Sequence, residues 1–436
     1  MKYFVTGITG TVVPVIIENL MAKDPDPYFY FAIRNGSNGE DIQSRFDKLV
    51  QTMDMDRVAR KKLVERSRLV EIDVEKENLG ISADMYTDLV QNTEKILHGA
   101  ADVRFDQPYE NIRISNVVFT EKIYDLFDAI KQHRRSAGLF EATLYYISTG
   151  YAYGVYKKPI PEDFPEFHPG KPDNTYAQTK AEAKRYILDR INSFNDRIVI
   201  FEPTIIGGKA KTGRTKTYNL HYLVMMLGYL GKLPFLTTPK NTLDIVPVDW
   251  VAAIISDIMA KDEFHQGALR LASGEEAVTI RFLHDRGYNY YVENDPVPGH
   301  VIPKIRFVPR WAFLLLVLLQ KSTYRSLYFI TRKKRYRKLV KGISLLEGYF
   351  PYITRYKKFE NAKSQKLIEK YTDCTKAPPL QDILDENGKL VEKGYMDKVL
   401  ADTLETGWGG MVDYERLEKK TAAYKSPQAA YSTSRK

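Results

Sequence analysis

The sequence has very little cysteine and shows no metal-binding pattern. Cys374 is the single cysteine among 436 residues, which excludes an internal disulfide framework and a cysteine-based zinc site and fits a reducing compartment. The seven histidines show no metal-ligand spacing, so no metal site is predicted. We therefore expect a cytoplasmic protein without a bound metal.

The sequence also has no long hydrophobic run and no secretory leader. Its longest uninterrupted apolar stretch covers residues 311–319, whereas a membrane-spanning helix needs about 20 residues. Met1 and Lys2 lead directly into an apolar strand and a glycine turn, unlike the charged and apolar regions of a signal peptide. With 44% hydrophobic and 28% charged residues, the composition is that of a globular chain, long enough for about two to three ordinary domains.

Acidic residues are missing from one long segment. Residues 296–346 contain twelve lysines and arginines but neither aspartate nor glutamate. The rest of the chain holds 53 basic against 55 acidic residues, so this segment accounts for the whole net charge of +10. The apolar run 311–319 and the basic cluster 332–338 both lie within it. Hydrophobic and cationic residues are therefore adjacent here.

Three interpretations of this segment remain open. Residues 311–338 would form a peripheral element on the inner face of an anionic membrane, where each cation near the surface contributes about 1 kcal/mol. Alternatively, they form a buried helix of the substrate region with a solvated basic face. Nucleic-acid binding is the third interpretation, but no recognised nucleic-acid module surrounds the basic residues. No nucleic-acid partner is therefore expected.

The beginning of the chain has the pattern of a βαβ unit. Apolar residues predict a strand at 2–6, a helix at 12–21 and a second strand at 28–33. Between the first strand and the helix, Gly7 permits a tight turn, and Gly10 lets the backbone approach a pyrophosphate at the helix N-terminus. This arrangement predicts a dinucleotide-binding site.

Two positions modify this prediction. Val13 stands where such turns usually have a third glycine, and we expect it to hold the helix further from the strand. Arg34 follows the second strand, where an NAD enzyme usually offers a carboxylate to the ribose. A guanidinium there suits a 2′-phosphate, so NADPH is the predicted cofactor. The alternative is an ordinary surface arginine at a strand end.

Strand and helix patterns continue to alternate up to about residue 205. Further strands are predicted at 68–73, 95–98, 144–148 and 198–201, and long helices at 116–132 and 176–192. This alternation argues for a doubly wound parallel sheet. We predict an α/β fold, with a Rossmann-type domain and a smaller, mostly helical C-terminal region associated with substrate and membrane. The predicted divisions are a NADP-binding domain (1–205), a substrate-binding region with sheet-completing segments (206–295), the basic apolar segment (296–346), a helical region (347–420) and a flexible tail (421–436).

A tyrosine and a lysine are the strongest candidates for catalysis. Tyr176 and Lys180 are four residues apart on a predicted helix, so both side chains lie on one face. An adjacent ammonium lowers the pKa of a tyrosine from its usual value of about 10, and we expect Tyr176 to exchange protons near neutrality. Thr149 follows a strand at the carboxyl edge of the sheet, where ligands bind. It is placed to hydrogen-bond a carbonyl oxygen.

Five motifs occur in the order found in one superfamily. They are TGITG (6–10), HGAA (98–101), NVVFT (116–120), STGYAYG (148–154) and YAQTK (176–180). Together they resemble the extended short-chain dehydrogenase/reductase superfamily. Within it, the segments IDV (72–74), NLGIS (78–82), AADVRF (100–105), PT (203–204) and DIVPVD (244–249) resemble the male-sterility-like NAD-binding branch of fatty acyl-CoA reductases and thioester reductases. The resemblance covers about residues 1–255 and fades beyond.

The resemblance implies roles for individual residues. Thr149 and Tyr176 would bind the substrate oxygen, Lys180 would hold the nicotinamide ribose and tune Tyr176, and Asn116 would support the proton relay. The implied cofactor-binding residues, besides Tyr176 and Lys180, are Gly7, Thr9, Gly10 and Thr11 at the pyrophosphate, Arg34 at the 2′-phosphate, Asp73 and Val74 at the adenine, Ala100 and Ala101 at the ribose side, and Pro203. Gly99 departs from the family, which commonly has asparagine after this histidine.

The resemblance implies an NADPH-dependent reductase of a lipid carbonyl. The expected substrate is a long-chain acyl thioester of CoA or of an acyl carrier protein, reduced to the aldehyde or the alcohol. The other expected partners are an anionic membrane surface at residues 311–338 and a second copy of the chain in a homodimer.

Other functions are compatible with the same motifs. One is a ketone/alcohol dehydrogenase, similar to 3-beta-hydroxysteroid dehydrogenases, acting on a sterol or another polycyclic lipid. A nucleotide-sugar epimerase or dehydratase is a further alternative, although it needs no basic apolar segment. A third is a non-catalytic NADP-binding or scaffold protein, which the presence of both Tyr176 and Lys180 argues against.

Overall fold

The computed structural model describes residues 1–36, 39–154, 158–162, 172–218, 221–384 and 390–422. These residues form two compact units. Unit 1 consists of residues 1–206, 244–275 and 358–377, and unit 2 of the described residues in 207–243, 276–357 and 378–436. Of the tail predicted at 421–436, residues 423–436 lie outside the described ranges.

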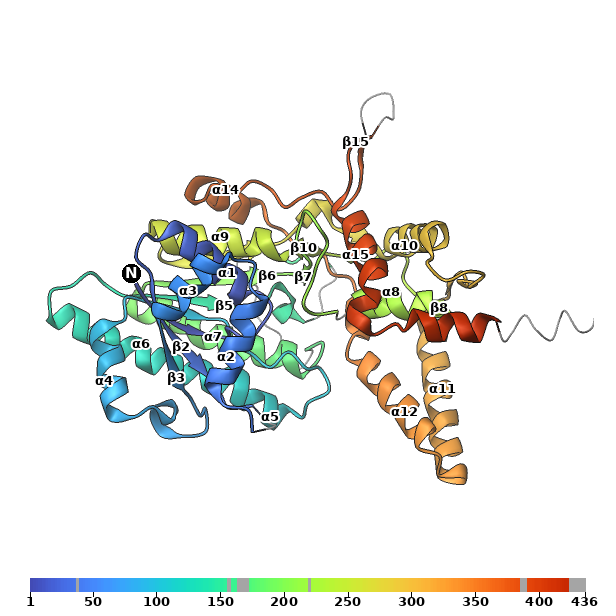
Figure 1. Ribbon diagram of the computed structural model, residues 1–436, viewed down its shortest axis with the longest axis horizontal. Helices are drawn as coiled ribbons and strands as arrows, with labels where there is room; N and C mark the ends of the chain where they lie inside the picture. The colour runs from blue at the N-terminus through green and yellow to red at the C-terminus, as the bar shows by residue number, and fades with distance from the viewer. Residues whose placement is uncertain (37–38, 155–157, 163–171, 219–220, 385–389, 423–436) are drawn as a thin grey trace, which may run out of the picture. The chain divides into compact units, whose positions relative to one another are not determined.

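A seven-stranded sheet forms the centre of unit 1 (Figure 1). Its order is β11-β6-β5-β4-β1-β2-β3, and every adjacent pair is parallel. The strands are β1 (Lys2–Thr6), β2 (Tyr28–Ile33), β3 (Ser67–Glu71), β4 (Lys95–His98), β5 (Thr143–Ile147), β6 (Ile198–Pro203) and β11 (Gly267–Leu271). The predicted parallel sheet is confirmed. Strand β11 lies in the region 206–295, where sheet-completing segments were expected, but its position was not predicted, because the buried Arg270 interrupts its apolar pattern.

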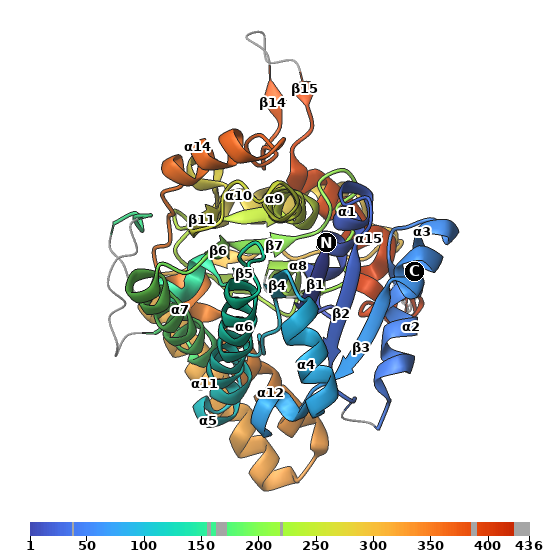
Figure 2. The ribbon, with the colours of Figure 1, turned by 90° about the vertical axis from the view of Figure 1, so that its left-hand side faces the viewer.

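Helices cover both faces of this sheet (Figure 2). Side chains of β1 alternate between the faces, since Tyr3 and Val5 belong to one hydrophobic cluster and Phe4 to the other. The first cluster includes helices α1 (Val13–Lys23), α2 (Ile42–Thr52) and α9 (Val248–Lys261). The second includes α4 (Ala83–Asn92), α6 (Phe119–Ser136) and α7 (Thr175–Phe194). The fold is therefore the doubly wound Rossmann type.

The remaining elements of unit 1 are short. They include α3 (Arg57–Glu65), α5 (Tyr109–Arg113), α14 (Ala362–Tyr371), the paired strands β7 (Ile205–Gly207) and β10 (Ile245–Pro247), and the 3-10 turn Gly150–Tyr153. All strands of the main sheet run in one direction, so their carboxyl ends share one edge. Strand order reverses between β1 and β4, and a ligand-binding crevice is expected outside that point.

Helix α7 carries two of the predicted catalytic residues. It starts where Asn174 caps it, because the Asn174 side chain accepts a hydrogen bond from the backbone N–H of Ala177 at 2.8 Å. It ends at Asn195, whose φ of 51° is left-handed, a conformation that asparagine tolerates. The cap places Tyr176 in the first turn and Lys180 one turn later.

Unit 2 is mostly helical. Its helices include α8 (His221–Tyr229), α10 (Ile280–Asn294), α11 (Arg310–Thr331), α12 (Lys334–Glu347), α13 (Phe350–Thr354) and α15 (Tyr395–Gly410), and residues 414–422 are also helical. Its short strands pair as β8 (Phe235–Leu236) with β13 (Arg306–Phe307), β9 (Thr242–Leu243) with β12 (Val278–Thr279), and β14 (Ile383–Leu384) with β15 (Leu390–Glu392). Trp408 lies 5.2 Å from Tyr229 and 5.4 Å from Tyr291 between ring centroids. These aromatic rings join α8, α10 and α15.

Helices α11 and α12 form a hairpin from the basic apolar segment. They pack against each other, and Lys321 pairs with Glu347 at 2.5 Å. In α11 the buried residue is Phe313, whereas Trp311 is 71% and Leu318 60% exposed. The interpretation of this segment as a buried helix is therefore wrong. Among the described ranges, none of the helices combines the length and hydropathy that crossing a bilayer requires.

Candidate active site

The turn after β1 has the geometry of a dinucleotide site. Gly7 has a φ of +86°, and a Cβ there would lie 2.6 Å from the backbone nitrogen of Ala100. Only glycine fits this position. The Gly10 N–H donates to the Gly7 carbonyl at 2.9 Å and closes the turn, while Thr9 and Gly10 are exposed. No side chain caps the first turn of α1, an arrangement that suits an anion. These residues therefore fit a bound pyrophosphate.

Val13, in place of the third glycine, packs against Gly99 at the end of β4. A Cβ on Gly99 would lie 2.5 Å from Cγ2 of Val13. With valine at position 13, only glycine therefore fits at position 99. The φ of Gly99 lies outside the left-handed region, and space alone therefore explains this glycine. The two departures from the family pattern compensate for each other.

The end of β2 is next to a second, unpredicted cation. Arg34 is exposed there, and Arg104 pairs with Asp102 at 2.6 Å. Burial acts to raise the pKa of Asp102, but hydrogen bonds from Arg104 hold it below its usual value, and the Arg34 charge helps. The Asp102 carboxylate thus holds the Arg104 guanidinium, and the exposed Arg34 is close enough for its charge to act on the same carboxylate.

The predicted adenine side lies after β3. Asp73 is half-buried and Val74 is buried, and the Asp73 carboxylate accepts a hydrogen bond from the Glu75 N–H at 3.1 Å. The Val74 carbonyl accepts from Lys122 Nζ at 2.8 Å. This local network holds the loop in a defined conformation.

Thr149 lies just after β5 and is buried. Its Oγ1 donates to the carbonyl of Pro203 at 3.3 Å and accepts from the Tyr151 N–H at 3.2 Å. A hydrogen bond also links the Thr149 side chain with that of Tyr176. The structure thus brings together the two groups predicted to bind the substrate oxygen.

Tyr176 titrates differently from the expectation. Burial raises its pKa to about 12, and the hydrogen bond with Thr149 opposes this rise. Its ring lies 5.6 Å from that of Phe105 between centroids, a contact that the sequence analysis missed. The expectation that Lys180 lowers this pKa is wrong for this structure, because desolvation of the phenolate dominates.

Lys180 points to the strand edge. Its Nζ donates to the carbonyl of Ile147 at 2.8 Å and lies 4.5 Å from the centroid of the Tyr146 ring. Burial lowers the pKa of Lys180 to about 7, since the charged ammonium loses its hydration. Near neutral pH the side chain is therefore divided between its charged and neutral forms.

Asn116 lies in a π-helical turn, Ile114–Val118, that precedes α6. Such turns occur frequently at functional sites. The Asn116 Oδ1 accepts from the Asp102 N–H at 2.7 Å, and Nδ2 donates to the Asp102 carbonyl and to Thr179 Oγ1, each at 3.0 Å. Asn116 thus connects α7 to the loop after β4. Its role in a proton relay stays a prediction.

Two buried groups beside these residues were missed. His98 lies between Thr6 and Thr120, with its ring nitrogens 2.8 and 3.1 Å from their hydroxyl oxygens. Burial and the charge of Lys180 lower the pKa of His98 to about 3. A neutral histidine therefore supports the ends of β1 and β4. A histidine that ends an apolar strand was the available signal.

The second group is a buried ion-pair cluster. Lys184, one turn beyond Lys180, contacts both Glu202 and Tyr153, and Arg270 lies 3.4 Å from Glu202. Burial lowers the pKa of Lys184 to about 8, while Glu202 acts to raise it. This cluster holds α7 against β6 and β11. A charged residue inside the apolar strand 198–203 was its signal in the sequence.

Comparison with known proteins decides the family. Residues 5–255 match the model of the family described as "Male sterility protein". The chain belongs to this family. The predicted branch and the predicted class, an NAD(P)-dependent oxidoreductase of the extended short-chain type, are confirmed.

Two curated relatives of the male sterility protein family match beyond this region. L-2-aminoadipate reductase of Saccharomyces cerevisiae is 24% identical over an alignment of 316 residues that covers 67% of this chain and 22% of the relative. Fatty acyl-CoA reductase wat of Drosophila melanogaster is 24% identical over an alignment of 417 residues that covers 86% of this chain and 78% of the relative. The chain thus spans less than a quarter of the yeast reductase.

A solved structure supports the fold. The terminal R domain from the myxalamid PKS-NRPS biosynthetic pathway superposes with a TM-score of 0.67 at 21% identity, covering 93% of this chain and 91% of that domain. At this identity the likeness establishes the fold alone. It extends over most of the chain, including the helical part beyond the family match.

Proposed function

We propose that this protein is an NADPH-dependent reductase of a long-chain acyl thioester, carried by CoA or an acyl carrier protein. One observation carries the proposal: the side chains of Thr149 and Tyr176 lie together at the carboxyl end of β5, where Lys180 also binds. A hydroxyl, a phenol and an ammonium there suit reduction of a carbonyl group. The reductase names of two relatives support it.

The side chains would act on the carbonyl oxygen. Bound NADPH supplies the hydride for the carbonyl carbon. Thr149 donates a hydrogen bond to the oxygen, and Tyr176 gives it a proton as negative charge develops. The raised pKa of Tyr176 keeps the phenol protonated for this donation. The resulting hemithioacetal breaks its C–S bond, so that sulfur leaves as a thiol and the aldehyde remains.

A substrate panel tests the reaction. Purified protein is incubated with NADPH and palmitoyl-CoA, and NADPH consumption and free thiol are measured together. Thioester reduction consumes NADPH and releases one thiol for each aldehyde formed. NADPH loss without thiol, seen with a sterol ketone instead, would identify the alternative ketone/alcohol dehydrogenase. No consumption with any acyl thioester would contradict the proposal.

Arg34 supports a preference for NADPH over NADH. Its exposed guanidinium, close to Arg104 and Asp102, suits a 2′-phosphate. Hydrogen bonds to charged groups contribute about 1.5–3 kcal/mol, so Arg34→Gln should lower the NADPH-to-NADH ratio of kcat/KM by roughly tenfold to a hundredfold. Lys61→Gln, on the exposed side of α3, is the control. An unchanged ratio in Arg34→Gln would show that this arginine does not recognise the 2′-phosphate.

The hairpin of α11 and α12 supports a location at an anionic membrane. Trp311, Leu318 and Phe329 are 71%, 60% and 69% exposed, and no acidic side chain occurs in residues 296–346. Exposed apolar residues beside an excess of cations match a lipid surface with negative headgroups. The products of acyl reduction are themselves apolar and partition there.

Vesicle sedimentation tests this location. Binding should be stronger to phosphatidylcholine vesicles that contain phosphatidylserine than to phosphatidylcholine alone, and should weaken with salt. The combined variant Trp311→Ser, Leu318→Ser and Phe329→Ser should lose binding. Phe140→Ser is the matched control, because Phe140 is 93% exposed in unit 1. Equal sedimentation of all three proteins would exclude the hairpin as the contact.

A further inference from the structure

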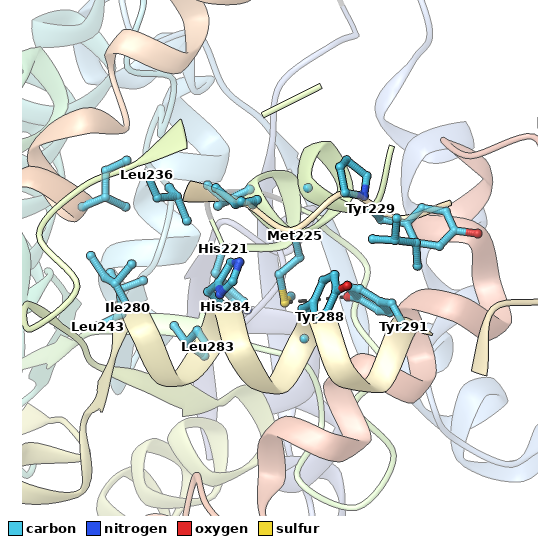
Figure 3. Close-up of a pocket in the computed structure, with 17 residues that line it drawn as sticks. His221, Met225, Tyr229, Leu236, Leu243, Ile280, Leu283, His284, Tyr288 and Tyr291 are labelled. Atoms are coloured by element: carbon cyan, nitrogen blue, oxygen red, sulfur yellow. Dashed lines mark hydrogen bonds between the residues drawn. The ribbon is translucent and has the colours of Figure 1, made fainter. Parts of the chain in front are cut away.

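Unit 2 contains a cavity whose lining includes none of the predicted catalytic or cofactor residues. Its walls come mainly from α8, α10 and the segment 302–305. Figure 3 shows Met225 and Tyr229 of α8 and Leu283 and Tyr291 of α10 around it. All of the lining residues belong to unit 2. The cavity can therefore be analysed without reference to unit 1.

The lining is strongly apolar. It includes Val224, Leu236, Leu243, Ile280 and Ile302, and apart from histidine it contains no side chain that is charged at neutral pH. The empty space amounts to about 730 Å³, including space that is open to solvent. A concave, mostly apolar site with a few polar groups is the usual form of a small-molecule pocket.

Two histidines supply those polar groups. His221 is 3% exposed, and neither of its ring nitrogens has a hydrogen-bond partner among the described residues. A buried polar group without a partner costs about 1–3 kcal/mol. Burial lowers the pKa of His221 to about 3, so the ring is neutral at physiological pH. A neutral imidazole offers one donor and one acceptor.

The second histidine is oriented by a carboxylate. His284 Nδ1 lies 2.7 Å from Asp285 Oδ1, so this nitrogen carries the proton and donates it. Its Nε2 has no hydrogen-bond partner in the described part of the chain, and the side chain is 3% exposed. In the neutral ring Nε2 is an acceptor. The pocket thus presents ring nitrogens without a hydrogen-bond partner in the described part of the chain, on apolar walls.

We propose that this pocket binds an uncharged apolar molecule with a hydroxyl group, whose O–H donates to an imidazole nitrogen of His221 or His284. A hydroxyl both donates and accepts, as the two rings require, and an aliphatic chain matches the walls. A carboxylate would lose its hydration against these walls, so burying it there is costly. The ligand class is therefore an aliphatic alcohol.

A pair of isomers tests the proposal on the full-length protein. Octanol and methyl heptyl ether have the same atoms, but only octanol has an O–H. Calorimetric titration should give at least about tenfold tighter binding of octanol, since tenfold corresponds to about 1.4 kcal/mol. His221→Phe and His284→Phe should each reduce this preference and retain the ether affinity. His265→Phe, at an exposed position, should leave both affinities unchanged.

Several outcomes would overturn the proposal. Equal affinity of the two isomers, or no binding of either, would show that the histidines do not recognise a hydroxyl. An undiminished preference in both variants would place the alcohol elsewhere. If circular dichroism shows that a variant does not fold, the comparison of the isomers on the wild-type protein still decides.

The pocket could serve the acyl substrate itself or a separate lipid alcohol, and a kinetic measurement distinguishes the two. If the pocket receives the chain of the acyl substrate, octanol should raise the KM for an acyl thioester without changing kcat. If it holds a separate lipid alcohol, octanol should bind while leaving that KM unchanged. This measurement rests on the proposed reduction, whereas the calorimetric comparison does not. A failure of the proposed function would therefore leave the binding result interpretable.

Discussion

Tyr176 and Lys180 lie one helical turn apart, and burial shifts their pKa values in opposite directions. The pKa of Tyr176 rises to about 12 and that of Lys180 falls to about 7. Both shifts have the same cause, because a low-dielectric environment favours the neutral form of an acid and of a base alike. Above neutrality both side chains are therefore uncharged. A protonated phenol is the form that a reduction needs.

Removing the phenol should abolish reduction without abolishing cofactor binding. Tyr176→Phe is expected to lower kcat by about 10²–10⁴, the usual contribution of general acid catalysis. The affinity for NADPH, measured by fluorescence titration, should change by no more than about fivefold, since one neutral hydrogen bond contributes about 1 kcal/mol. Tyr186→Phe, on the same helix, is the control. Full activity of Tyr176→Phe would remove this residue from the mechanism.

Lys180 should make cofactor binding depend on pH. The ammonium is lost as pH rises through about 7, so its attraction for the nucleotide should disappear in the same range. We expect NADPH affinity of the wild type to exceed that of Lys180→Met at pH 6. The difference should shrink to nearly nothing by about pH 9. A difference that stays constant over this range would mean that Lys180 does not titrate there.

At the scale of the elements, the start of α1 packs closely against the end of β4. Val13 occupies the space that a Cβ on Gly99 would need. Gly99→Asn alone should therefore displace the start of α1 and weaken NADPH binding by roughly tenfold or more, because overpacking costs about 1–3 kcal/mol. Val13→Gly combined with Gly99→Asn should restore most of the affinity.

A double-mutant cycle measures this coupling. The NADPH dissociation constants of both single variants and of the double variant are compared with that of the wild type. We expect an interaction energy of about 1 kcal/mol or more in favour of the double variant. Additive effects would show that the two positions are independent, and that the close contact is relaxed by other movements.

For the whole molecule, buried histidines predict acid sensitivity. His98 in unit 1 and His221 in unit 2 both have a pKa lowered by burial from 6.5 to about 3. Below pH 6.5 the unfolded chain binds protons that the folded chain does not, so the free energy of unfolding falls as pH is lowered. Each histidine contributes about 1.4 kcal/mol per pH unit in this range.

Urea unfolding between pH 7 and pH 4 measures the effect. His98→Gln should reduce the slope of the free energy of unfolding against pH, because glutamine does not titrate, whereas His98 is protonated only when the chain unfolds. His265→Gln, at an exposed position in the same unit, should leave the slope unchanged. Identical slopes for His98→Gln and the wild type would show that His98 does not govern acid unfolding.

The parallel sheet could be predicted because local patterns carry it. Short apolar runs alternate with helical segments, and each of the strands predicted up to residue 201 is present within a few residues. The seventh strand could not be found in this way. Arg270 interrupts its apolar pattern, and its burial is possible only because Glu202 and backbone carbonyls from distant segments surround its guanidinium.

The roles of the candidate residues follow a similar division. Local spacing is enough to place Tyr176 and Lys180 on one face of α7, and the order of motifs is enough to indicate a nucleotide site. The pKa of each group depends on how deeply its neighbours bury it, and those neighbours come from β5, from the loop after β4 and from the turn that contains Thr149. A sequence does not specify that environment directly.

The amino-acid sequence alone was sufficient for the fold of unit 1, the family and the chemical class of the candidate site, because these depend on short-range periodicity and motif spacing. The three-dimensional structure was needed to show that Val13 and Gly99 compensate for each other, that burial outweighs the lysine charge at Tyr176, and that an apolar pocket in unit 2 contains two histidines. Each of these features joins residues far apart in the chain, and desolvation and packing depend on such neighbours.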